Sequence, residues 1–316
     1  MTTAPKSRTI WHNGQFVDWD QANVHVSSHA LHYGSSWFEG IRCYKSSRGS
    51  EVFRLGEHVK RLFDSCKIYR REIPFSSQDF QEAILETIRV NELEHCYIRP
   101  LILCGTGSLG LNPLSTPTEC FILVWEWGRY LGEESVEQGV DVCVSSWNRA
   151  TPNTFPSMAK VGGNYINSIL IKMEAVKSGF AEGVALDTQG FISEGSGENI
   201  FLVHNEKLYT PSLGNAILPG ITRDSVITLA KERGYEVLEQ SLPREMLYLA
   251  DEIFLAGTAA EVSPIRSVDH IVVGDGKRGP ITTQIQRDFF DYIEGKVEDR
   301  HSWMTPVYKE ERVQSS

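Results

Sequence analysis

Apolar residues recur at spacings of three and four in four stretches of the chain, and this spacing predicts helices. These stretches are residues 55–69, residues 77–91 with Ser77 as a plausible cap, residues 164–178, and a segment that starts after Pro219-Gly220 and stops before Gly234. On the third helix, the side expected to be buried carries Tyr165, Ile166, Ile169, Leu170, Met173 and Val176.

Short apolar runs bounded by turn residues predict strands between these helices. The Asn13-Gly14 pair lies between two apolar stretches and is a strong hairpin signal. The longer runs, 95–104 and 119–127, are separated by a loop rich in Gly, Pro, Ser and Thr. In the second half of the chain, the expected strands are 140–147, 184–186, 199–203 and 252–256.

Helices and strands mix in both halves, so the pattern predicts an α+β or α/β protein with two domains. The length of 316 residues allows one large or two medium domains. The polar segment 128–139 is the best candidate for a link. We therefore expect a small N-terminal α/β domain over 1–128, an interdomain loop over 129–139, and a larger C-terminal domain over 140–316.

Composition narrows the class of protein. Hydrophobic residues make up 41% and charged residues 23%, which excludes a disordered chain, a collagen-like fibre and a coiled coil. The net charge of −10, with no basic block, makes nucleic-acid binding a poor hypothesis. We also expect no membrane span and no signal peptide, because no apolar run is long enough.

The cysteines and histidines carry no metal-binding pattern. The six cysteines form no CxxC pair, so we expect buried, reduced thiols in a cytoplasmic protein. His29 and His32 lie three apart, but no acidic or cysteine partner stands at ligand spacing. The sequence therefore predicts no metal site.

Two side chains could carry chemistry beside glycines. Lys160 precedes Gly162-Gly163 at a helix start, and a desolvated lysine there would be a nucleophile toward carbonyls. Glu194 lies in a glycine-rich turn, where its carboxylate could meet a cationic ring nitrogen. By themselves, both residues are better explained as ordinary solvated side chains.

Three further features could bind anions. The helix start at 218–224 offers free backbone amides and the hydroxyl of Thr222, although it could be simple capping. The small residues at 257–260 leave room for a similar site. Tyr97 and Arg99 share one face of an apolar strand, and the partner of Arg99 could be a substrate carboxylate or an internal acid.

Six motifs follow one another along the chain: HALHYGSSWFEGIRCY (29–44), YIRPLI (97–102), KVGGNYINS (160–168), GFISEGSGENIF (190–201), LPGITRD (218–224) and YLADEIFLAGTAAEVSPIRSVD (248–269). In this order they resemble the branched-chain amino acid aminotransferases, which are fold-type IV pyridoxal-phosphate (PLP) enzymes with a D-amino acid aminotransferase-like architecture. The resemblance covers roughly residues 9–300. The resemblance implies a C-terminal domain with a pseudo-barrel that carries the PLP lysine.

The resemblance implies a role for each matching residue. Lys160 matches the lysine that holds the cofactor and moves the proton, and Glu194 matches the acid on the pyridine nitrogen. The other implied cofactor contacts are Arg61, Tyr165, Leu218, Ile221, Thr222 and Thr258. The implied substrate contacts are Tyr33, Phe38, Gly40, Tyr97, Arg99, Trp127, Tyr130, Thr258 and Ala259.

The activity implied is amino transfer from L-leucine, L-isoleucine or L-valine to 2-oxoglutarate, by a ping-pong reaction through Lys160. A D-amino acid or (R)-amine transaminase, or an aminodeoxychorismate lyase, is the alternative on the same fold, and a non-enzymatic binding protein would have lost Lys160 or Glu194. Trp37 stands where the family has a small aliphatic residue, so it could alter packing or the pocket. The resemblance also implies a homo-oligomer, a dimer or a hexamer of dimers, with the active site at the subunit interface and Leu109 in the loop that the partner subunit contributes.

Overall fold

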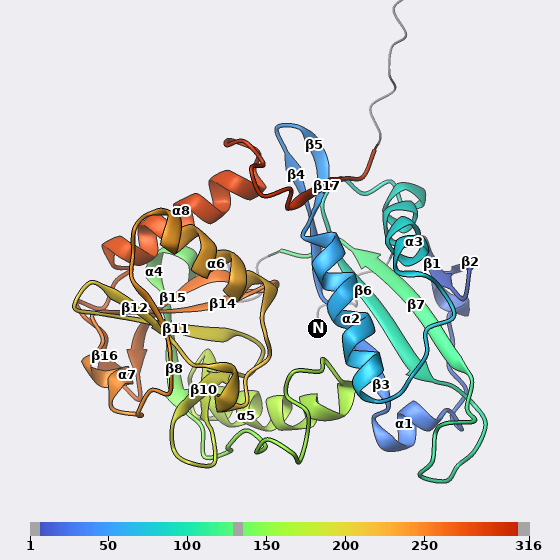
Figure 1. The fold of residues 1–316 in the computed structure, drawn as a ribbon, viewed down its shortest axis with the longest axis horizontal. Helices are drawn as coiled ribbons and strands as arrows, with labels where there is room; N and C mark the ends of the chain where they lie inside the picture. Colours follow the sequence, from blue (N-terminus) through green and yellow to red (C-terminus); the bar gives the residue numbers. More distant parts are fainter. Residues whose placement is uncertain (1–6, 129–134, 309–316) are drawn as a thin grey trace, which may run out of the picture. The chain divides into compact units, whose positions relative to one another are not determined.

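A computed structural model describes residues 7–128 and 135–308 of the chain (Figure 1). By its contacts the chain divides into two compact units, Met1–Trp127 with Asp291–Ser316, and Gly128–Phe290. Residues 291–316 therefore group with the first unit, whereas the sequence-based division assigned them to the second domain. Within the described residues, no helix is long and apolar enough to cross a membrane.

In the described residues, the first unit contains an eight-stranded sheet with the order β17-β5-β4-β6-β7-β1-β2, and β3 also pairs with β6. All of these pairings are antiparallel. The strands are β1 (Thr9–His12), β2 (Gln15–Asp18), β3 (Ser36–Phe38), β4 (Ile41–Ser46), β5 (Gly49–Phe53), β6 (Cys96–Cys104), β7 (Thr118–Trp125) and β17 (Met304–Pro306).

Two long helices of the first unit, α2 (Leu55–Ile68) and α3 (Ser77–Val90), pack against each other and against this sheet. Their apolar faces are buried, as the spacing of three and four predicted. The cap of α3 is Ser76 and not Ser77, because the Ser76 side chain accepts a hydrogen bond from the Asp79 amide. The short helices here are η1 (Trp19–Gln21) and α1 (His29–Tyr33).

The described part of the second unit holds a nine-stranded sheet, ordered β10-β9-β8-β15-β14-β11-β12-β13, with β16 beside β15. Parallel pairs join β8 to β9 and to β15, and antiparallel pairs join β14 to β11 and β15. The strands are β8 (Val140–Val144), β9 (Glu182–Leu186), β10 (Ile192–Gly195), β11 (Asn199–His204), β12 (Lys207–Thr210), β13 (Val237–Glu239), β14 (Glu252–Gly257), β15 (Glu261–Val268) and β16 (Ile271–Val272).

Helices lie against this sheet, with α5 on β9 and α6 on β14 (Figure 1). Buried apolar side chains, which include Ile200, Leu202 and Leu255 of the sheet, form a core of this unit. The helices are α4 (Ser135–Gln138), η2 (Gly162–Asn164), α5 (Tyr165–Lys177), η3 (Leu213–Asn215), α6 (Ile221–Glu232), α7 (Met246–Leu249) and α8 (Pro280–Ile293), the last of which runs into the residues grouped with the first unit.

The prediction for the buried side of α5 was wrong. The side chains that face the protein are Ser168, Ile171 and Ala175. Four of the apolar residues expected inside are at least half exposed in the single chain: Ile166, Ile169, Met173 and Val176. An apolar stripe at helical spacing predicts that one face of the helix is buried. It does not show whether that face is buried by the same chain or by another chain.

Two other predictions from local sequence, the first hairpin and the buried thiols, are confirmed. The Asn13-Gly14 pair closes the β1–β2 hairpin with positive φ at both residues, 48° and 93°. All six cysteines are free and buried. Among the described residues, no group of three or more His, Cys, Asp or Glu side chains could hold a metal ion.

Candidate active site

Lys160 stands just before η2, in the second unit, and its side chain is partly buried. Its Nζ lies 2.5 Å from the Oη of Tyr165, the first residue of α5. The chain folds back through Gly162-Gly163 between the two residues, which brings them together although they are only five positions apart. The structure therefore joins two of the predicted site residues directly.

Glu194 lies on β10, and its carboxylate is buried among hydrogen-bond donors. Oε2 accepts hydrogen bonds of 3.0 Å from the Asn199 side-chain amide and from the backbone amide of Leu218. Oε1 lies 3.3 Å from a guanidinium nitrogen of Arg149. The carboxylate is therefore held in one orientation by three elements of the same unit.

The electrostatics of Glu194 reflect this burial. Removal from water raises the pKa of Glu194 above its usual range, while Arg149, the Leu218 amide and the charge of Lys160 oppose that rise. Lys160 is thus close enough to act electrostatically on Glu194. A cation placed against this carboxylate would favour its ionised form further.

Two residues that hold Glu194 escaped the sequence analysis. Arg149 is buried and also donates hydrogen bonds to the carbonyls of Gly195 and Ser196, so it fixes the turn that follows Glu194. Asn199 also donates to the Leu218 carbonyl. Asn199 lies inside a quoted motif, but Arg149 lies in a polar loop without a periodic pattern and gave no signal.

The predicted anion-binding residues of this unit lie at two backbone turns. Ile221 and Thr222 form the first turn of α6, after Gly220 as its cap. A side chain at Gly220 would put its Cβ 1.9 Å from Asn199 Oδ1, so only glycine lets this segment lie against Asn199. Thr258 and Ala259 lie in the turn between β14 and β15. A helix start and a tight turn both present backbone amides suited to a phosphate or carboxylate.

These residues of the second unit fit PLP chemically. The cofactor needs a lysine amine, a carboxylate for its ring nitrogen, a donor at its phenolic oxygen and amides for its phosphate. Lys160, the buried Glu194, Tyr165 beside the lysine, and the first turn of α6 supply these groups in that order.

In the first unit, aromatic side chains gather around Arg99 at β3, β6 and the end of β7, and they include Trp125, 5.0 Å from Tyr97. The Arg99 guanidinium donates a 3.1 Å hydrogen bond to Tyr97 Oη and lies 4.7 Å from the centre of the Phe38 ring. Trp127 meets Tyr97 edge to face at 4.7 Å. A Cβ at Gly40 would lie 2.0 Å from Tyr97 Oη, so the glycine makes room for the tyrosine.

Arg99 carries an unused donor in this cluster. Its Nε is buried and has no hydrogen-bond partner, and in the described part of the chain no carboxylate pairs with the guanidinium. Of the two partners left open by the sequence, an internal acid is therefore absent among the described residues. An orphaned, buried Nε–H fits the carboxylate of a ligand.

The remaining predicted residues of the first unit lie elsewhere. Tyr33 ends α1, and its hydroxyl donates to the Leu109 carbonyl at 2.8 Å. Arg61 lies on α2, paired with Glu39. Tyr130, which follows the first unit in the sequence, falls outside the described residues. Trp37 is buried on the side of β3 opposite Phe38 and packs edge to face on Tyr69, so it acts on core packing and does not join the aromatic cluster.

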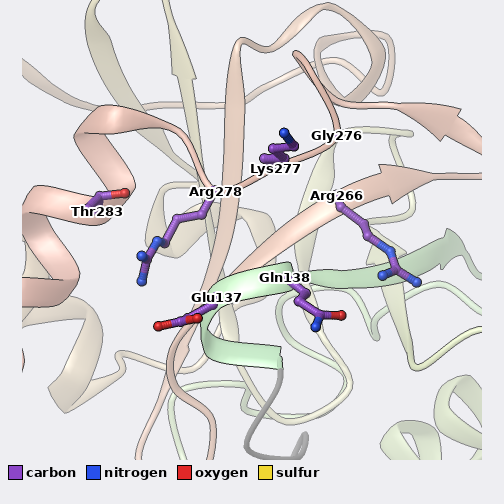
Figure 2. Close-up of a pocket in the computed structure, with 7 residues that line it drawn as sticks. All are labelled: Glu137, Gln138, Arg266, Gly276, Lys277, Arg278 and Thr283. Carbon is purple, nitrogen blue, oxygen red and sulfur yellow. The ribbon is translucent and has the colours of Figure 1, made fainter.

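A separate hollow of about 440 Å³ lies in the second unit, near α4 (Figure 2). Two of its cations have partners within the chain, because Arg266 is bound to Asp141 and Arg278 to Gln286. Figure 2 shows these two arginine side chains pointing in different directions. None of the predicted site residues lines this hollow, so we do not assign it a role in the reaction.

Comparison with known proteins defines the class. The amino-transferase class IV family matches residues 36–268. The chain therefore belongs to the class IV aminotransferases, as the motifs predicted, and the two-sheet α/β architecture is the fold of that family.

The particular relatives are branched-chain-amino-acid aminotransferases. The Escherichia coli (strain K12) protein of that name is 54% identical over 306 residues, covering 96% of this chain and 99% of its own length. A crystal structure of the Escherichia coli enzyme superposes with a TM-score of 0.95 at 54% identity, covering 96% of this chain and all of that one. The Thermobaculum terrenum enzyme, solved in its PLP form, gives 0.89 at 33% identity, covering 96% and 99%. These matches place the chain in the branched-chain branch of the family.

Proposed function

We propose that this protein is a PLP-dependent transaminase that moves the amino group of L-leucine, L-isoleucine or L-valine to 2-oxoglutarate, giving branched-chain 2-oxo acids and L-glutamate. The observation that carries the proposal is the Lys160–Tyr165 contact together with a buried, arginine-held Glu194 on which the charge of Lys160 acts. The likeness to enzymes named for this activity favours it over the D-amino acid and (R)-amine alternatives.

In this proposal the cofactor is held by the residues that the resemblance named. Lys160 would bind it covalently, Tyr165 would serve its phenolic oxygen and Glu194 its ring nitrogen. Leu218 would pack on the ring, and the phosphate would be bound by Arg61, Ile221, Thr222 and Thr258. When bound, PLP supplies an electron-withdrawing ring that stabilises negative charge at the substrate Cα.

The chain's own groups then handle the protons. Lys160 Nζ takes the proton from the substrate Cα, and the hydrogen bond to Tyr165 keeps the amine on one side, so the transfer is stereospecific. Glu194 holds a proton on the ring nitrogen, and its contacts with Asn199 and Leu218 keep the carboxylate aimed.

The substrate contacts explain how one site accepts two kinds of side chain. The aromatic walls at Phe38, Tyr97 and Trp127 suit an aliphatic chain. The unused Arg99 Nε–H suits the γ-carboxylate of glutamate. We assign Tyr33, Gly40 and Tyr130 to the same pocket and the Thr258-Ala259 turn to the α-carboxylate.

The half-reaction tests this function without a coupled assay. We expect L-leucine, L-isoleucine, L-valine and L-glutamate each to abolish the visible absorbance band of the bound cofactor, and 2-oxoglutarate to restore it. D-alanine and (R)-1-phenylethylamine should leave the band unchanged over the same time. Conversion by D-alanine alone would reverse the assignment, and a protein that binds no PLP on reconstitution would refute it.

We also propose that the protein acts in the cytoplasm as a homo-oligomer with its active site at the subunit interface. The exposed apolar stripe of α5 supports self-association, because contiguous apolar surface of this kind marks interaction sites. So does the loop that carries Leu109 and Leu111, whose side chains are exposed although Tyr33 and His29 hold the loop backbone.

Charges on the α5 stripe should weaken that association. We expect the double variant Ile169→Glu, Met173→Glu to sediment as a smaller species than the wild type, because each glutamate would lose its hydration in the interface. The folded monomer should tolerate both changes, since the two positions are half exposed. Lys177→Glu, at the exposed end of α5, is the matched control. An unchanged sedimentation coefficient in the double variant would exclude α5 from the interface.

A further inference from the structure

A fully buried carboxylate lies outside the set of site residues described so far. Glu39 occupies the link between β3 and β4, between Phe38 and Gly40, and its side chain is 0% exposed. A carboxylate removed from water is costly unless it is paired. Glu39 is paired with two residues of α2, His58 and Arg61.

Both oxygens of Glu39 are engaged. Oε1 accepts from Arg61 Nε at 2.7 Å, and Oε2 accepts from Arg61 Nη2 at 2.8 Å. Oε2 also lies 2.8 Å from His58 Nδ1, and the Gly40 amide donates to it at 3.3 Å. Burial alone would raise the pKa of Glu39, but Arg61 and His58 outweigh burial and hold the pKa well below its usual range.

This geometry fixes the direction of Arg61. A guanidinium bound through Nε and one Nη to a single carboxylate cannot rotate without breaking both hydrogen bonds. An anion that binds Arg61 therefore meets a guanidinium whose orientation is already fixed. His58, one turn earlier on α2, fixes the carboxylate in turn.

We propose that Glu39 is a positioning residue for cofactor binding, which aims Arg61 at the phosphate of PLP. The inference rests on the proposed function, which assigns Arg61 to that phosphate. Preorganising the arginine avoids the cost of ordering it when the anion binds. The same carboxylate accepts a hydrogen bond from the Gly40 amide. Glu39 therefore also connects Arg61 to the backbone segment that lies against Tyr97.

A double-mutant cycle on the dissociation constant of PLP tests this role. The apo forms of the wild type, Glu39→Gln, Arg61→Gln and the double variant are titrated with PLP, and binding is read from the visible absorbance band. We expect Glu39→Gln to weaken binding about 10-fold, as loss of a residue that orients a ligating side chain does elsewhere. The double variant should bind no more weakly than Arg61→Gln, because Glu39 acts through Arg61.

Glu51→Gln is the matched control for loss of a buried acid. Glu51 is buried on β5 and pairs with Arg48, so its loss should lower the melting temperature without changing the PLP dissociation constant. Glu39→Asp, which keeps the charge on a shorter side chain, replaces Glu39→Gln if that variant does not fold, and should bind with intermediate affinity.

The outcomes separate this inference from the proposed function. An unchanged dissociation constant in Glu39→Gln, or effects of the two substitutions that multiply in the double variant, would overturn the positioning role alone. An unchanged constant in Arg61→Gln would remove Arg61 from the phosphate site, and with it both the assignment and the inference.

Discussion

Replacing Lys160 by alanine is expected to abolish transamination and the visible absorbance band of the bound cofactor together. The substitution removes the amine that binds PLP covalently and the same nitrogen that moves the substrate proton, so kcat should fall by at least about 10³-fold. Phosphate contacts remain, so some PLP should still bind non-covalently. Spectra of the reconstituted variant, with initial rates on L-leucine and 2-oxoglutarate, check both expectations.

Lys177→Ala is the control for this variant. Lys177 is an exposed lysine at the end of α5, in the same unit, and its loss should change neither the spectrum nor the rate. If Lys160→Ala kept the visible band and more than a tenth of the wild-type rate, another amine would have to carry the chemistry.

The second large effect is expected at Glu194. In Glu194→Gln the side-chain carbonyl can still accept from Asn199 and Leu218, so the local fold should survive. The amide cannot keep a proton on the ring nitrogen, and kcat should therefore fall by about 10²-fold or more. The bond to Lys160 should still form, so the visible band should persist while its conversion by L-leucine becomes slow in stopped-flow traces.

Glu252→Gln provides the comparison for this variant. Glu252 is another buried acid of the second unit, on β14, and it accepts from the backbone amides of Ile281 and Thr282 at the start of α8. Its loss should cost stability and leave the half-reaction rate unchanged. Equal slowing in both variants would mean that Glu194 acts only by supporting the fold.

The sequence predicted α2 and α3 well because the apolar residues of each lie on one face, but it did not predict α8, which is equally long. The spacing in α2 and α3 reports burial against their own sheet, and the structure confirms it. In α5 the same spacing falls on a stripe that is exposed in the single chain. Apolar periodicity is the same whether a helix face packs within its own chain or against a second chain, so the spacing alone could not tell the two apart. The short strands β3, β4 and β5 gave no periodic signal and were not predicted.

The candidate site was predicted from sequence motifs. The motifs identify the residues expected to contact cofactor or substrate, but they do not identify the side chains that hold those residues in place. Lys160 contacts Tyr165, and the charge of Lys160 acts on Glu194, while the roles that the motifs imply for these residues stay a prediction. Arg149 and His58 were missed, because a side chain that orients another contacts it across the fold and not along the chain. Only tertiary structure shows that Arg99 has no acid partner in the described residues.

Borohydride reduction followed by peptide mapping tests the central claim most directly. Reduction of the PLP-loaded protein makes the bond between the cofactor and its lysine permanent, and we predict that the added mass lies on the peptide that contains Lys160 and on no other. A label on a different lysine, or no label in a protein saturated with PLP, would contradict the account.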